Sequence, residues 1–235
     1  MLTPAIRITV CNGGMNRKIV LLGLAILGLA GGAYVVRRPL LMAGPACLDG
    51  LWDGCLSTDN GVVLMTLAGV PLALLLAGAL AWLRRTRGGS AWRFSLAEVG
   101  MIYGTLPFVW LTVMPGPGAG VVPGRVSLIP LRDLITMGPL GIGGNLLVLA
   151  ALGFFAPMRF AALASVPRIL ALGAVCSVLI ETAQYVFQLD RVSSVDDVLV
   201  NATGAALAAL LSRRWWRTAA EAQVDRAQPA HAPAS

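Results

Sequence analysis

The chain has 235 residues and a net charge of +7; 57% of its residues are hydrophobic and only 12% are charged. Soluble domains carry about 25% charged residues, so this composition excludes a soluble globular domain, whose surface it could not cover. The basic residues lie mostly between apolar runs, without the aromatic-basic interleaving of RNA-binding proteins, which argues against nucleic-acid binding. One histidine and four cysteines without a Cys-x-x-Cys motif argue against a zinc site, and we expect no metal and no cofactor.

Six apolar runs predict an all-α fold, a polytopic transmembrane helical bundle of about six spans. A run of about 20 apolar residues can cross the hydrocarbon core, where only a helix pairs all of its own backbone amides. The runs cover residues 19–36, 61–83, 96–114, 139–156, 167–189 and 195–211. The chain is therefore divided into an N-terminal segment (1–17), the first three spans (18–114), the last three spans (115–212) and a basic, then disordered tail (213–235).

The first run has two interpretations. It follows Arg17 and Lys18 and contains Gly31, Gly32 and Ala33, so it is either the first span or a signal sequence that is cleaved. Met15 is an alternative start of the chain, in which case residues 1–14 are not translated. The arrangement of the later spans is the same in each case.

The distribution of basic residues predicts the orientation. If the N-terminus lies inside, 13 of the 18 lysine and arginine residues lie on the cytoplasmic side and 5 lie outside. Short cytoplasmic loops carry an excess of such residues, so both ends are predicted to lie in the cytoplasm of a multi-pass plasma-membrane protein. Trp215 and Trp216 then lie where interfacial aromatic anchors are common.

Cys47 and Cys55 fall in the predicted external loop, within the sequence CLDGLWDGC. In an oxidising compartment the two thiols can form a disulfide, because the Gly- and Asp-rich stretch between them can bend back on itself. The alternative is that both are unpaired, small hydrophobic side chains. Cys176 lies within a span, where a packing role is expected.

Two further features receive structural interpretations. Glu98, near the cytoplasmic end of the third predicted span, is expected to be a helix-start or snorkelling carboxylate. Residues 115–124, PGPGAGVVPG, are predicted to form a loop with no packed structure of its own.

Polar side chains recur on one face of each of the last spans. Ser177, Glu181, Gln184 and Gln188 have the spacing of a single helix face in the fifth predicted span. In the sixth, Asp197 and Asn201 share a face with Gly204 and Ala208, and the fourth carries Asn145. Such side chains are costly within a bilayer and mark function by default.

With the predicted orientation, these side chains share one outer-leaflet layer beneath the LDRVSSVDD segment. Arg191 is expected to pair with Glu181 or with Asp196 and Asp197, although the two aspartates could instead cap the sixth helix. The layer is interpreted as an outward-facing pocket for a hydrophilic head group; the alternative is an interhelical hydrogen-bond cluster that stabilises the bundle. The predicted ligand-binding residues are Asn145, Ser177, Glu181, Gln184, Arg191, Asp196, Asp197 and Asn201.

The same residues resemble the signature of VanZ-like proteins. The pattern is Glu181-x2-Gln184-x6-Arg191-x5-Asp197-x3-Asn201-x-Thr203-Gly204. Two weaker blocks agree in order, one led by Asn145 with the later Gly153 and Pro157, and one at residues 127–130. The family usually has Asn at the position of Ser127, and Phe and Pro at those of Leu149 and Ala151. The resemblance covers residues 125–211.

The family is named for a protein that gives low-level resistance to the glycopeptide teicoplanin. The resemblance therefore implies a bacterial cell-envelope membrane protein that lowers antibiotic binding at the surface, and it implies no catalytic mechanism. The leading hypothesis is that the pocket binds a lipid-linked or glycan envelope component. The alternative is an intramembrane enzyme, in which Glu181 and Asp197 act as acid and base and Arg191 holds a phosphate. A transporter is disfavoured, because no inverted repeat is visible.

Overall fold

The computed structural model describes residues 55–85 and 91–218, together with residues 23, 26–28, 30–34, 37, 40–45 and 47. Expectations for residues 1–17 and for the tail beyond residue 218 lie outside these described residues, as does much of the first apolar run. The chain divides into two compact units, residues 1–64 and 65–235. In the first unit, Cys47 and Cys55 are joined by a disulfide, with Cα atoms 5.3 Å apart.

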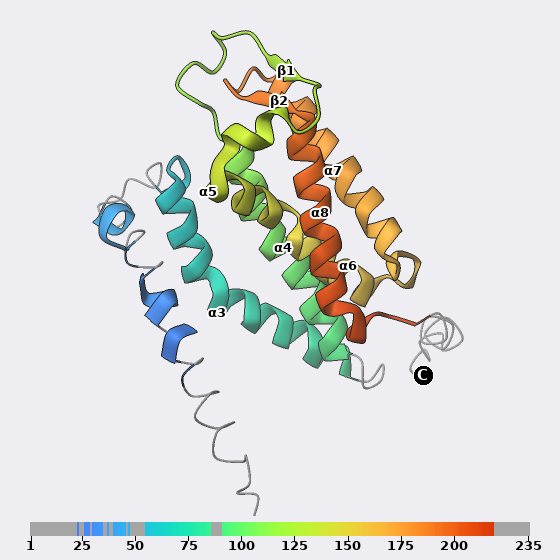
Figure 1. Ribbon diagram of the computed structural model, residues 1–235. Helices are drawn as coiled ribbons and strands as arrows, with labels where there is room; N and C mark the ends of the chain where they lie inside the picture. Colours follow the sequence, from blue (N-terminus) through green and yellow to red (C-terminus); the bar gives the residue numbers. More distant parts are fainter. Residues whose placement is uncertain are drawn as a thin grey trace, which may run out of the picture. The chain divides into compact units, whose positions relative to one another are not determined.

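Six long or medium helices and two short strands carry the rest of the described chain (Figure 1). In chain order, the elements are α3 (Asp59–Leu83), α4 (Ala91–Val113), β1 (Arg125–Ser127), α5 (Arg132–Val148), α6 (Ala150–Arg159), η2 (Ala161–Leu163), α7 (Val166–Val186), β2 (Val192–Ser194), α8 (Val195–Ser212) and η3 (Arg213–Trp215).

The prediction of an all-α, polytopic membrane protein is confirmed. In the described part of the chain, five helical segments are long and apolar enough to cross a bilayer. They are Asp59–Leu83, Ala91–Val113, Arg132–Arg159, Val166–Val186 and Val195–Trp215. The first predicted span, at residues 19–36, lies mostly outside the described residues, so that span and the orientation stay predictions.

The fourth predicted span is two consecutive helices rather than one. Gly138 has φ 68° and ψ 168°, which interrupts α5 just before Pro139, and Leu149 separates α5 from α6. Proline lacks the amide hydrogen that a continuous helix needs, and glycine accepts the positive φ at low cost. The two breaks enclose the short segment that carries Asn145.

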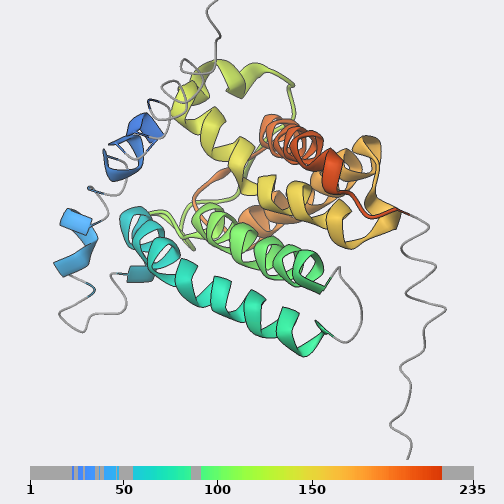
Figure 2. The same ribbon diagram turned by 90° about the horizontal axis from the view of Figure 1, so that it is seen from below.

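Helix α8 lies at the centre of the C-terminal half, against α5, α6 and α7 (Figures 1 and 2). Glycines allow the close approach: a Cβ at Gly204 would overlap the carbonyl oxygen of Leu146 in α5, and one at Gly153 in α6 would overlap that of Ala205. Because lipid tails are as apolar as leucine, close packing of small residues is a main source of helix association in membranes.

A charged cluster ties α3, α4 and α6 together at the end of the bundle away from the strands. The Glu98 carboxylate accepts from Arg84 Nη1 at 2.6 Å and from Arg159 Nε, and all three side chains are about one-quarter to one-third exposed. Glu98 lies in the interior of α4, well beyond its first turn. Its role is therefore to pair two arginines from neighbouring helices, and the interpretation as a helix-start carboxylate is wrong.

Replacement of Glu98 by glutamine should leave Arg84 and Arg159 facing each other without a counter-charge. We expect the free energy of unfolding to fall by about 1–2 kcal/mol, less than for a fully buried pair. The thermal unfolding midpoint of the detergent-solubilised protein measures it. Arg125→Gln is the control, since its ion pair with Asp190 is more exposed and should be worth under about 1 kcal/mol. Equal shifts in the two variants would contradict the assigned role.

Candidate functional site

The site lies at the end of the bundle where β1 and β2 pair in parallel, with Ser127 opposite Ser194. The Pro/Gly loop that precedes β1 packs against the segment after α7. The amides of Gly116 and Gly120 donate to the carbonyls of Leu189 and Gln188, each at 2.9 Å. Residues 115–124 therefore form a loop, as predicted, and this loop is held in place by the segment after α7.

Asp196 caps a helix other than its own. Its carboxylate accepts from three backbone amides at the start of α5: Leu131 N at 2.6 Å, Asp133 N at 2.8 Å and Leu134 N at 3.1 Å. Leu131, the N-cap residue of α5, has a left-handed backbone and no side-chain oxygen with which to cap. Asp196 is 1% exposed. Both of its oxygens are thus committed to holding α5 against α8.

Two serines and Asp133 close the end of the strand pair. Ser194 Oγ donates to Asp133 Oδ2 at 2.7 Å, and Ser127 also hydrogen-bonds that carboxylate. Ser194 is the N-cap of α8 and accepts from Asp196 N at 3.1 Å. Sequence reasoning missed Asp133 and Ser194. The Ser194-x-x-Asp197 spacing is a capping-box signal that could have identified the serine.

Glu181 lies on the buried face of α7, directly below β2. Its Oε2 accepts from Ser194 N at 2.9 Å, and its backbone carbonyl accepts from Ser193 Oγ at 2.8 Å. The side chain is 8% exposed, whereas Leu179 on the opposite face of the same helix is 64% exposed. Glu181 also interacts electrostatically with Asp197 and Arg191. A carboxylate is therefore held inside an otherwise apolar bundle, close to a second carboxylate.

Asp197 lies one residue after Asp196 and has different partners. Its Oδ1 accepts from Asn145 Nδ2 of α5. The side chain is half-buried, and Arg191 lies near enough to interact with it electrostatically. Within the described part of the chain, Asp197 Oδ2 and Glu181 Oε1 accept no hydrogen bond. Each carboxylate therefore keeps one oxygen free for a ligand.

Asn201 and Ser177 form a separate contact deeper between α7 and α8. Asn201 Nδ2 donates to Ser177 Oγ at 2.8 Å, and both residues are buried. The Asn201 Oδ1 atom is buried and has no hydrogen-bond partner among the described residues. This pair matches the interhelical hydrogen bond that the alternative interpretation predicts.

Arg191 and Gln184 both bind the C-terminal end of α4. Arg191 Nε and Nη2 donate to the carbonyls of Met114 and Leu111, at 3.3 and 3.2 Å. Gln184 Nε2 donates to the carbonyl of Thr112 at 2.9 Å. Arg191 thus caps the C-terminal end of a helix, where cations are favoured. It forms no salt bridge with Glu181, Asp196 or Asp197, the partners that the sequence predicted.

The structure therefore separates the eight predicted residues by role. We use "the polar site" for Asn145, Glu181, Arg191 and Asp197, which interact directly with one another. Asp196, Gln184, Asn201 and Ser177 instead hold helices together. Gln188 falls beyond the end of α7 and does not share its face. Among the described residues, no group of three or more His, Cys, Asp or Glu side chains could hold a metal ion.

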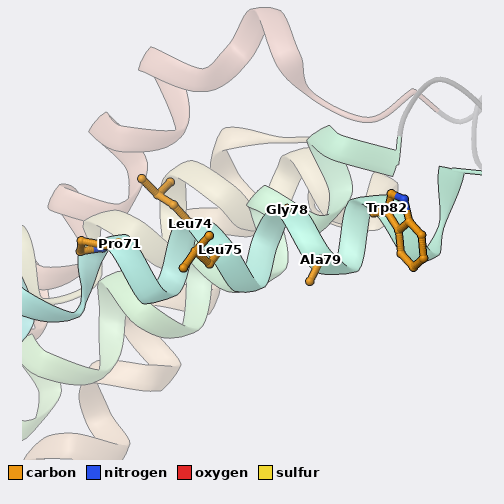
Figure 3. A pocket seen from close by; sticks show the side chains of 6 residues that line it. All are labelled: Pro71, Leu74, Leu75, Gly78, Ala79 and Trp82. Atoms are coloured by element: carbon orange, nitrogen blue, oxygen red, sulfur yellow. The ribbon is translucent and has the colours of Figure 1, made fainter.

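An apolar pocket lies elsewhere, on α3 (Figure 3). It is lined by Pro71, Leu74, Leu75, Gly78, Ala79 and Trp82. It carries no ionisable side chain, so it offers nothing to a charged head group and is not part of the polar site.

The fold and the polar site define a polytopic helical membrane protein with a carboxylate- and amide-lined site at one end of its bundle. A family model described as VanZ/LLP1 matches residues 74–217, and the chain belongs to this family. The match confirms the resemblance and extends it into α3 and α4. No curated protein and no solved structure matches the chain.

Proposed function

We propose that this protein binds the glycan head group of a lipid-linked cell-envelope component at the polar site. One observation carries the proposal: Glu181 and Asp197 are held in place through one oxygen each, and the other oxygen of each accepts no hydrogen bond from the described residues. Carboxylate oxygens accept hydrogen bonds from sugar hydroxyls, and a charge-assisted bond is roughly twice as strong as a neutral one.

The contrast with Asp196 supports a ligand-binding role. Asp196 is a structural carboxylate, and both of its oxygens are occupied by backbone amides. Ionisable side chains within a membrane bundle are costly and mark function by default, and contacts with the described residues use only one side-chain oxygen each of Glu181 and Asp197. A ligand that donates hydrogen bonds removes this cost.

Arg191 is the residue that would bind the phosphate of the ligand. It is exposed, and the helix-capping bonds to α4 use its Nε and Nη2 atoms. A guanidinium has five N–H donors, so others remain to bind a phosphate. A sugar joined to a lipid through phosphate would meet the carboxylates with its hydroxyls and Arg191 with its phosphate.

The predicted orientation would put this site in the outer leaflet of the plasma membrane, where lipid-linked glycans are displayed. Binding there could also lower the attachment of teicoplanin to the surface. Cells that express the protein should then bind less fluorescent teicoplanin than cells that express Asp197→Asn. Equal teicoplanin binding by the two kinds of cell would contradict a role in teicoplanin resistance and leave only binding of the lipid-linked component.

The ligand class is tested by native mass spectrometry of the full chain in lipid nanodiscs. The probes are a polyprenyl diphosphate-linked disaccharide, polyprenyl phosphate without sugar, and phosphatidylglycerol. The disaccharide-bearing lipid should bind at least about tenfold more tightly than the others, since it alone satisfies the two carboxylates. Equal binding of the sugar-free polyprenyl phosphate would contradict a glycan ligand.

A second candidate is an intramembrane enzyme, favoured by the electrostatic interaction between Glu181 and Asp197. Two interacting carboxylates can divide the roles of acid and base. If the protein is a hydrolase, incubation with the same disaccharide-linked lipid would let water cleave the glycosyl–phosphate bond and release free disaccharide and polyprenyl diphosphate in equal amounts. Recovery of all the lipid intact after a prolonged incubation would exclude hydrolysis of this substrate.

A further inference from the structure

Four large apolar side chains are exposed where the chain enters α5. Leu128, Ile129, Leu131 and Ile135 are between 57% and 86% exposed. Leu131 and Ile135 are one helical turn apart, so they share a face of α5. A group of exposed apolar side chains marks a site of interaction with protein or membrane. We call these four side chains the apolar rim.

The backbone of this segment keeps Leu131 exposed in a conformation that is unfavourable for leucine. Leu131 has φ 66° and ψ 1°, in the left-handed region, which glycine adopts at much lower cost. Asp196 accepts hydrogen bonds from three of the first amides of α5, and Arg132 N donates to Ile129 O at 3.4 Å. The amides at the start of α5 thus have acceptors within the protein, so this helix end does not need water.

The span that follows is long enough without the segment that carries Leu131 and Ile135. The apolar helical stretch Arg132–Arg159 has 28 residues, which would measure about 42 Å at 1.5 Å per residue. The hydrocarbon core is about 30 Å thick, and residues 139–159 cover that distance by themselves. The break at Gly138 separates residues 132–137 from this part. Residues 132–137 are therefore not needed to cross the bilayer, and the kink lets them leave the direction of the span.

We propose that the apolar rim inserts into the leaflet at the polar-site end of the bundle and packs against the lipid chains there. The rim continues a surface that already faces lipid, since Leu140, just after the break and within a membrane-spanning segment, is 92% exposed. Arg132 is exposed beside Leu131, and its stem can cover apolar surface while its charge stays among the lipid phosphates. A short segment of this kind lies in the membrane interface with its apolar face in the leaflet.

The test measures the membrane depth of single nitroxide labels on the full chain in vesicles of phosphatidylglycerol and phosphatidylcholine. Leu131→Cys and Ile135→Cys each introduce one label position. The background carries Cys11→Ser and Cys176→Ser, and the disulfide-bonded cysteines do not take the label. Oxygen concentrates among lipid chains and a nickel chelate stays in water, so power-saturation EPR with each reagent gives the depth. We expect both labels to lie about 5–10 Å below the lipid phosphates.

Two further positions serve as controls. Leu179→Cys labels the exposed face of α7 within a membrane span, and this label should lie deeper than those of the rim. Val121→Cys labels the Pro/Gly loop before β1, and this label should lie in water, although Val121 is about as exposed as Ile135. Thermal unfolding shows that each labelled variant is folded, and each of the two rim positions tests the proposal by itself.

Three results would overturn insertion of the apolar rim. Labels at positions 131 and 135 that collide with the nickel chelate as often as the label at position 121 would place the rim in water. Low collision rates with both reagents would show that protein, either a second copy or another partner, covers the rim. A label at position 121 that lies as deep as the rim labels would show that the whole end of the bundle is immersed, without a particular role for the rim.

Discussion

Replacement of Asp196 by alanine is expected to lower the free energy of unfolding by about 3–5 kcal/mol. The side chain is 1% exposed and accepts hydrogen bonds from three amides at the start of α5. Without it, those amides are left unpaired, and the positive end of the α5 dipole loses its negative partner. Thermal unfolding of the detergent-solubilised protein measures the loss.

The adjacent residue provides the control. Asp197→Asn should change the unfolding midpoint little, because Asp197 accepts one hydrogen bond from Asn145 and the asparagine keeps an oxygen for it. Asp196→Asn should fall between the two, since one oxygen still caps α5. If Asp197→Asn were as unstable as Asp196→Ala, the division between structural and ligand-binding carboxylates would be wrong.

A methyl group at Gly204 is expected to be the second severe change. In Gly204→Ala, the new Cβ would overlap the carbonyl oxygen of Leu146, so α8 and α5 must separate. Overpacking of this kind typically costs about 1–3 kcal/mol, and we expect the upper end because the obstacle is backbone and cannot change rotamer. The same separation would pull Asp197 away from Asn145.

Gly143→Ala is the matched control for Gly204→Ala. A Cβ at Gly143 has no neighbour within 4 Å, and alanine is the better helix former by about 1 kcal/mol. Its unfolding midpoint should therefore stay the same or rise. A fall of equal size in both variants would show that the bundle is sensitive to any change in α5 and α8, and not to their close approach.

The spacing of apolar and polar residues in the sequence predicted much of the fold and the buried polar face of α7. Apolar runs of bilayer length predicted the spans, and the spacing of Ser177, Glu181 and Gln184 predicted one buried face of α7, which the structure shows. The predicted fourth span begins at Pro139, directly after the break at Gly138, but it runs across the second break at Leu149, which no glycine or proline marks. Local signals of this kind depend only on neighbours in the chain.

The division of roles within the site could not be predicted, because it depends on contacts distant in sequence. Asp196 and Asp197 are equivalent in the sequence, but α5 presents three amides to the first and Asn145 to the second. Arg191 was expected to pair with a carboxylate, but the end of α4, about 80 residues earlier, offers it carbonyls instead. The placement of α4 and α5 against α8 determines both outcomes.

The most direct test of the proposed function compares three isosteric variants in their binding of the polyprenyl diphosphate-linked disaccharide in nanodiscs. Glu181→Gln and Asp197→Asn should each weaken binding by about tenfold or more, with little change in the unfolding midpoint. Asp190→Asn should bind as the unmodified protein does, because Asp190 pairs with Arg125 outside the polar site and asparagine tolerates its positive φ of 55°. Unchanged affinity in both site variants would contradict the assignment of the polar site as the ligand-binding site.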